Sequence, residues 1–178
     1  MNDFLPKGYE IPNKTSGYMK FEQGANKFRI LSSAITGYEF WADVNGKRTP
    51  LRFRMDQKFS ESDLKGAKPE EGKHFWAFVV WNYGAEIVQI LEVTQKSIQK
   101  AIKAMVASED WGDPKKYDII VTKEGEKLDT DYQTSPVPPK ELPDFIQALY
   151  RDTYINLNAL YEGKDPFNED VKPEEVKI

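Results

Sequence analysis

The clearest hydrophobic pattern in the chain lies at residues 73–83, where five aromatic side chains fall within eleven positions. Aromatic and β-branched residues at this density predict a β-strand. Alternate side chains of a strand point to opposite faces, and here both faces are apolar. One face carries Phe75, Ala77, Val79, Trp81 and Tyr83, and the other carries Trp76, Phe78 and Val80. Such a strand is either buried on both sides or meets a flat apolar ligand on one of them.

Further stretches have the alternation or the β-branched content of strands. They are residues 26–36, 38–44 beyond a bend at Gly37, 52–54, 86–93, 117–123 and 130–135. Turn signals at 82–85 and 124–127 join neighbouring strands into two hairpins. A polar connection over 45–72 separates the first strands from the first hairpin.

Two apolar stripes at helical spacing predict helices. The first helix begins after Thr94 as N-cap and ends near Ser108, and the second follows the prolines at 136–139. A short helix is expected at about 155–161. The two stripes consist of Ile98, Ala101, Ile102 and Met105, and of Leu142, Phe145, Ile146, Leu149 and Tyr150.

The elements therefore follow the order long bent strand, hairpin, helix, hairpin. This is the order of the OB-fold, so the predicted fold class is mainly β with helices: a five-stranded Greek-key barrel with a helix between its third and fourth strands, and extra C-terminal helices. The predicted segments are an irregular N-terminal arm at 1–26, the OB-fold nucleic-acid-binding domain at 27–138, a helical extension at 139–161 and a polar, mildly acidic tail at 162–178.

Composition narrows the classes of function. The chain has 178 residues and no cysteine, which excludes disulfides and cysteine zinc sites. No apolar run approaches the about 20 residues of a membrane helix, and the first residues lack the apolar core of a secretory signal. No nucleophile elbow, phosphate-binding loop or pair of metal-binding histidines is present. We therefore expect no catalytic residue, no metal, no cofactor and no membrane contact.

The net charge of −4 is unevenly distributed. Residues 1–138 hold 20 basic and 20 acidic side chains, whereas residues 139–178 hold 5 basic and 9 acidic ones. Within the neutral part, positions 44–58 gather five cations against Asp56 alone. A local basic patch of this kind favours a polyanionic partner.

Aromatic rings beside cations predict a surface for single-stranded nucleic acid, because rings stack bases and cations track phosphates. The residues expected to neutralise phosphates are Arg29, Lys47, Arg48, Arg52, Arg54 and Lys73. The residues expected to stack bases are Trp41, Phe53, Trp81 and Tyr83. Strands two and three of an OB barrel and the loops beside them form its usual ligand surface, which is where these clusters fall.

Other interpretations use the same residues. Most large aromatic side chains are buried in the hydrophobic core of a fold, and a basic loop can be exposed to solvent without binding any partner. An OB-like module that binds RNA or a protein would also use an aromatic face. Binding through phosphates weakens steeply with salt, whereas an apolar protein groove does not, so salt dependence separates these alternatives.

Several segments resemble the tailed-phage single-stranded DNA-binding proteins of the OB-fold type. The resemblance spans about residues 18–136 and rests on the segments 18–21 with Gly24, 26–33, 37–41, 74–83, 89–95, 111–114, and 117–119 with 128–130. It implies a protein that coats single-stranded DNA without strong sequence preference in phage replication, recombination or repair, in the cytoplasm of the bacterial host.

The resemblance also bears on partners and metals. Members of this family often end in an acidic tail that recruits replication or recombination proteins, and the C-terminal segment is the candidate here. The tail at 164–178 is only mildly acidic, with five carboxylates against three lysines. Some relatives carry a zinc site; this chain cannot build one from cysteines, so the resemblance implies no zinc here.

Overall fold

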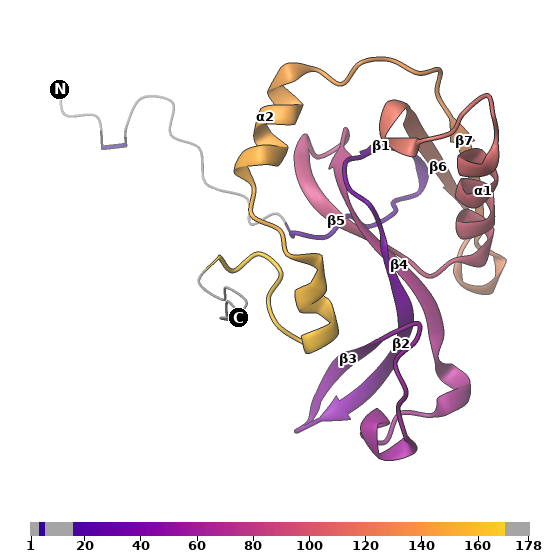
Figure 1. Cartoon of the computed structure of the whole chain (residues 1–178), viewed down its shortest axis with the longest axis vertical. Coiled ribbons are helices and arrows are strands. Elements are labelled where there is room, and N and C mark those ends of the chain that lie inside the picture. The colour runs from indigo at the N-terminus through magenta and orange to yellow at the C-terminus, as the bar shows by residue number, and fades with distance from the viewer. Residues whose placement is uncertain (1–3, 6–15, 170–178) are drawn as a thin grey trace, which may run out of the picture.

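The computed structural model describes residues 4–5 and 16–169 (Figure 1). Within these residues the chain is mainly β, with seven strands and two α-helices, so the predicted mainly β fold with helices is confirmed. The strands are β1 (Gly24–Ile30), β2 (Ile35–Val44), β3 (Lys47–Arg54), β4 (Lys73–Asn82), β5 (Ile87–Val93), β6 (Asp118–Glu124) and β7 (Asp131–Pro136). The helices are α1 (Lys96–Ala107) and α2 (Asp144–Asp152).

All strands pair in antiparallel fashion around β4. One edge of β4 pairs with β2 near its start and with β1 near its end, and the other edge pairs with β5. Beyond these pairs the sheet runs in the order β3-β2-β4-β1-β6-β7. Figure 1 shows β2 and β3 as a hairpin that projects from the lower end of the sheet, away from both helices.

The long bent strand expected near the N-terminus is divided into β1 and β2. Ile30 pairs with Val80 and Ile35 with Ala77, so this stretch holds two residues more than the edge of β4 that it follows. The Val79 N–H donates to Ser32 Oγ at 2.9 Å, which fixes the step between the two strands. An insertion of this kind bends a strand and redirects it, and β2 can therefore leave the sheet with β3.

The predicted barrel requires its third and fifth strands, here β5 and β7, to pair. No such pair occurs within residues 16–169, so the sheet is open in the described part of the chain. The edge of β5 meets residues 17–19 instead. The Met19 N–H donates to the Ile90 carbonyl at 2.8 Å, and the Ile90 N–H donates to the Gly17 carbonyl at 2.9 Å.

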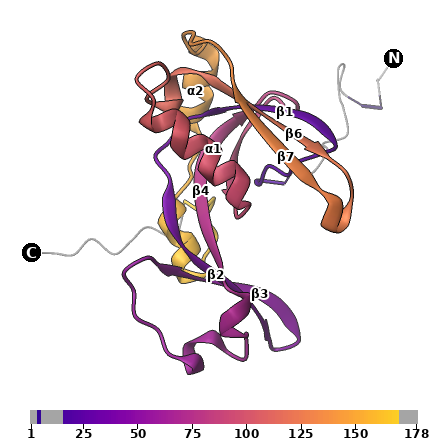
Figure 2. The same cartoon turned by 90° about the vertical axis from the view of Figure 1, so that its right-hand side faces the viewer.

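Both apolar faces of β4 are covered. Trp76, Phe78 and Val80 pack on the side of α1, which Figure 2 shows in front of β4. Phe75, Ala77, Val79 and Trp81 pack against residues 142–167, which include α2 and the 3-10 helix η5 (Leu157–Glu162). The first interpretation of the 73–83 pattern, burial on both sides, therefore holds for most of the strand, with Trp76 only partly buried.

The predicted segments correspond to the structure as follows. The helical extension at 139–161 contains α2 and most of η5. The strands begin inside the predicted arm at 1–26, since β1 starts at Gly24, and residues 1–3 and 6–15 lie outside the described part. Of the predicted tail, positions 170–178 also lie outside it. In the described residues, every helix is too short or too polar to cross a membrane.

Candidate nucleic-acid interface

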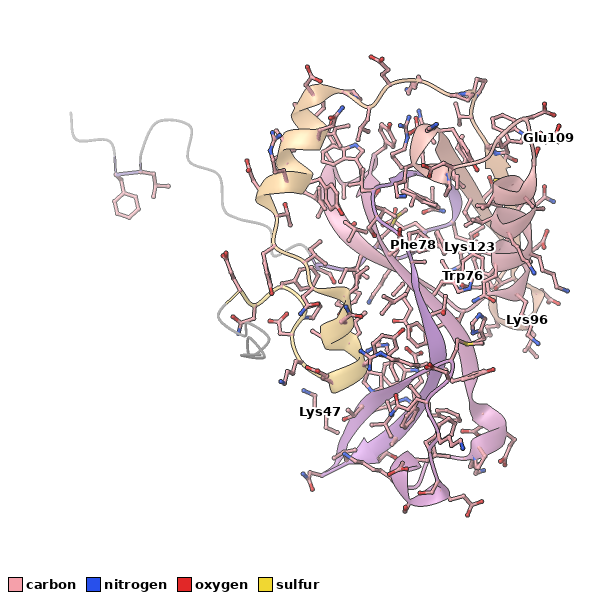
Figure 3. All side chains as sticks on the ribbon, viewed as in Figure 1. Lys47, Trp76, Phe78, Lys96, Glu109 and Lys123 are labelled. Carbon is pink, nitrogen blue, oxygen red and sulfur yellow. The ribbon has the colours of Figure 1, made fainter. Side chains whose placement is uncertain are left out.

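The β2–β3 hairpin sorts the predicted site residues onto two faces, because directly opposed residues of paired strands share a face. The opposed pairs are Trp41 with Pro50, Asp43 with Arg48, Glu39 with Arg52, Gly37 with Arg54, and Glu39 with Lys73 of β4. We call the surface formed by Trp41, Arg48, Pro50, Arg52, Arg54 and Lys73 the outer hairpin face. Lys47, which Figure 3 labels, and Phe53 belong to the opposite face.

Trp41 is the exposed aromatic residue of the outer hairpin face. Its side chain is 42% exposed, and the Arg48 guanidinium lies over the ring, 5.5 Å from the centroid. The indole N–H donates to Glu39 Oε1 at 3.0 Å, which orients the ring. A solvent-accessible ring next to a guanidinium plane can stack a nucleobase and contact the adjoining phosphate.

Arg52 is held between two carboxylates. Its Nε donates to Glu39 Oε2 at 3.1 Å, and one terminal nitrogen donates to Glu92 Oε2 at 2.8 Å. Burial, together with the hydrogen bond and charge of Glu92, raises the pKa of Glu39 to about 8. The Arg52 side chain is only 9% exposed, so it organises the face more than it offers a free cation.

Arg54 and Lys73 are the exposed cations that complete the outer hairpin face. The Arg54 guanidinium lies 4.3 Å from the centre of the Tyr161 ring in η5. The Tyr161 hydroxyl in turn donates to the Thr36 carbonyl at 2.6 Å. The C-terminal segment thus borders the cations that the sequence analysis selected, and it limits the free part of this face to the side of Trp41 and Arg48.

Phe53 requires a correction, because it is a core residue. It is 8% exposed and stacks on Phe59, with ring centroids 4.4 Å apart and an interplanar angle of 24°. Phe40 and Leu64 complete the cluster, which residues 55–72 build over the inner side of the hairpin. The segment 55–72, predicted as a polar connection, therefore contributes apolar side chains that cover Phe53, and the Phe53 ring is not exposed for a base to stack on it.

Trp81 is likewise buried, at 4% exposure. Phe145 of α2 meets its ring edge-on at 6.0 Å, and Ile146 and Leu31 fill the same cluster. The prediction placed a ligand on this outer side of β4. The chain itself covers it, because α2 and η5 bring their apolar stripe to the sheet.

Arg29 is a structural residue rather than a surface cation. It is 1% exposed, its Nε donates to Asp118 Oδ1 at 2.7 Å, and its terminal nitrogens donate to the carbonyls of Lys115 and Lys140 at 3.2 Å each. Burial alone would raise the pKa of Asp118, but hydrogen bonds from Tyr83 and Arg29 and the charge of Arg29 lower it overall. The carboxylate therefore stays ionised inside the fold.

Tyr83 belongs to this Asp118 cluster and lies at the other end of β4 from the hairpin. Its hydroxyl donates to Asp118 Oδ1 at 2.8 Å, and burial with that bond raises its pKa to about 12. The Lys27 ammonium lies 4.6 Å and that of Lys140 5.9 Å from the ring centroid. The structure thus groups Tyr83 with Arg29, away from Trp41.

The lysines around the Asp118 cluster were not among the predicted site residues. Lys115 and Lys116 lie in the 3-10 helix η3 (Pro114–Lys116), and Lys140 approaches Asp118 to 3.4 Å. The adjacent Lys115 and Lys116 were a visible signal, but Lys140 is distant in sequence and only the fold brings it there. His74 is also accounted for: its Nδ1 lies 2.9 Å from the Gly37 carbonyl, and its Nε2 accepts from Trp76 Nε1 at 3.2 Å.

Within the described ranges, no group of three or more His, Cys, Asp or Glu side chains is placed to hold a metal ion. A scan against protein-family models and a search of curated proteins found no match to this chain.

Proposed function

We propose that this chain binds single-stranded DNA without strong sequence preference, and that the outer hairpin face is its contact surface. The observation that carries the proposal is the pairing of Trp41 with Arg48, in which a 42% exposed indole lies 5.5 Å from a guanidinium. Base stacking on an aromatic platform and phosphate neutralisation by neighbouring cations are the two contacts that sequence-tolerant binding of single strands requires.

The strand order supports an OB-type assignment. We infer that β1 with β2 corresponds to the first OB strand, β4 and β5 to the second and third, and β6 and β7 to the fourth and fifth, with α1 between the third and fourth. In that fold the loop between the first two strands flanks the nucleic acid. Here this loop consists of β3 and residues 55–72, and Arg48 of β3 lies beside Trp41 near the end of β2, which agrees with a ligand at these two residues.

We further propose the setting that the resemblance implies: phage DNA replication, recombination or repair in the host cytoplasm, without catalysis, cofactor or metal. Recruitment of replication or recombination proteins is assigned to the C-terminal segment. Its last nine residues, 170–178, lie outside the described part of the chain.

The test is a tryptophan-fluorescence titration with oligo-dT and with duplex of equal length at two salt concentrations. Because only single strands expose their base faces, we expect oligo-dT to bind about tenfold tighter than duplex and to quench the emission. Binding should also weaken steeply with salt. Equal affinity for both nucleic acids would refute the proposal, and tight oligo-U with weak oligo-dT binding would identify an RNA-binding module instead.

A further inference from the structure

A mainly apolar hollow of about 460 Å³ lies on the α1 side of the sheet, away from the outer side of β4 that α2 and η5 cover. Trp76 and Phe78 of β4 contribute its aromatic wall, and Figure 3 labels both on the side that faces α1. The opposite wall comes from α1, where Val106 is 48% exposed although it is apolar. Pockets that bind small ligands have this size and this apolar lining.

The charges around this hollow have one sign. Lys103 of α1 and Lys115 of η3 are exposed and line it, and no Asp or Glu is among its described lining residues. The loop between β1 and β2 adds the hydroxyl-bearing residues Ser32 and Ser33. An occupant with an apolar body and negative charge fits these surroundings.

A second hollow of about 380 Å³ adjoins the first, since Lys115 lines both. Its lining contains the cations Arg29, Lys115, Lys116 and Lys140 against the single carboxylate Glu141. Part of this positive charge is neutralised by ion pairs within the chain, because Lys115 lies 3.8 Å from Asp113 and Lys140 lies 3.4 Å from Asp118. Asp118 is nevertheless shared by Arg29, Lys27 and Lys140, so the cluster keeps an excess of cations.

We propose that these two hollows form a second contact site for single-stranded nucleic acid, in which an unstacked base enters beside Trp76 and the adjoining phosphates lie on Lys103, Lys115 and Lys116. An apolar recess next to a cationic one repeats the alternation of base and phosphate along a strand. A peptide would match this surface only if its own sequence happened to place an apolar side chain next to acidic ones. The inference rests on the proposed binding of single-stranded DNA, but it concerns a surface on the other side of the sheet from the outer hairpin face.

The first experiment blocks the recess without changing its charge. Val106→Trp, or Ala34→Phe from the loop between β1 and β2, would fill the hollow from an exposed position. Binding is measured for oligo-dT and for an abasic strand of equal phosphate count. We expect either variant to weaken oligo-dT binding about tenfold, with the abasic strand unaffected, because the filled recess can no longer admit a base. Thermal unfolding of each variant checks that the fold is intact.

The second experiment reverses the charge. Lys103→Glu with Lys115→Glu should weaken binding of both strands and flatten the salt dependence. The matched control, Lys20→Glu with Arg151→Glu at exposed positions outside both proposed contact surfaces, should not. A strand carrying 5-iododeoxyuridine should cross-link on irradiation to the peptide that contains Trp76 as well as to the one that contains Trp41.

The outcomes separate the two proposals. If wild type binds oligo-dT but the blocked and charge-reversed variants bind like their controls, or if cross-links form only at Trp41, the second site is refuted and the hairpin proposal stands. If wild type fails to bind oligo-dT at all, the proposed function fails and the second site fails with it. If an acidic apolar peptide competes for the Trp76 hollow while oligo-dT does not, the site belongs to a protein partner.

Discussion

Arg52, Glu39 and Glu92 form a charged triad whose protonation sets the charge of the outer hairpin face. Arg52 lies between Glu39 and Glu92, and the fold keeps this triad on the outer hairpin face, beside Trp41. Burial of Glu39 raises its pKa, so the triad gains negative charge as the pH rises toward 8. A polyanion would meet a less favourable surface at that pH.

The first prediction concerns Glu39→Gln. The pKa of Glu39 is raised in the fold from 4.5 to about 8, so the folded chain holds this proton more tightly than the unfolded chain does. Its stability contribution is therefore lost as the pH rises from 4.5 toward 8. We expect the wild type to lose at least about 1 kcal/mol more than Glu39→Gln between pH 5 and 9. Urea denaturation at both pH values measures this, and parallel losses would contradict it.

A second prediction at this scale follows from the buried Arg29. Arg29→Ala leaves Asp118 in the interior without its closest partner, and breaking a buried ion pair in this way costs about 3 kcal/mol. Lys27 and Lys140 remain near the carboxylate and moderate the loss. Chemical denaturation measures this loss in the free energy of unfolding. The control is Arg151→Ala at an exposed position, which should stay within about 0.5 kcal/mol of wild type. A loss no larger than that of the control would contradict the structural role of Arg29.

At the scale of elements, α2 and η5 decide which strand faces are free. Their apolar residues cover the outer side of β4, where Ile146 is 1% and Leu160 3% exposed. The same helix α2 leaves Phe145 60% and Leu149 45% exposed. The C-terminal segment is thus part of the packed fold, and its contribution to stability is concentrated in a few side chains.

The third prediction compares two positions of α2. Ile146→Ala removes a fully buried side chain and should cost about 2–4 kcal/mol, because it leaves a cavity between α2 and β4. Leu149→Ala on the same helix is the matched control and should cost less than about 1 kcal/mol, since its side chain is largely exposed. Urea denaturation followed by circular dichroism gives both values. Equal losses would mean that α2 is not docked as the structure has it.

At the scale of the whole molecule, the candidate contacts lie on two sides of the sheet. The outer hairpin face offers one exposed ring with cations, and the α1 side offers a recess with lysines. The sheet between them is covered on one side by residues 142–167. A strand bound by this protein would therefore follow the projecting hairpin and the α1 side rather than the outer surface of β4.

The fourth prediction separates the two kinds of interaction at the hairpin. Arg48→Ala with Arg54→Ala should weaken oligo-dT binding and reduce the slope of log affinity against log salt by about 0.7 for each phosphate that is no longer neutralised. Trp41→Leu should weaken binding by about five- to tenfold with that slope unchanged, because it removes stacking alone. The control is Lys20→Ala with Arg151→Ala, two exposed cations outside the proposed contacts. Normal binding by the double arginine variant at all salt concentrations would show that the hairpin is only a solvated loop.

The sequence alone determined the local pattern of this protein. It predicted β4 from the alternation at 73–83, the β4–β5 hairpin from the turn that follows, and α1 from the stripe between Ile98 and Met105. These predictions succeed because the periodicity of a strand or helix depends only on residues that are close together in the chain. The cluster at 44–58 likewise identified Arg48 as a cation near Trp41. Tertiary structure decided what covers each face. Trp81 is buried by α2 and Phe53 by residues 55–72, and the buried Arg29 is paired with Asp118. Periodicity fixes the side to which a residue points, but burial depends on distant segments whose packing only the assembled fold selects.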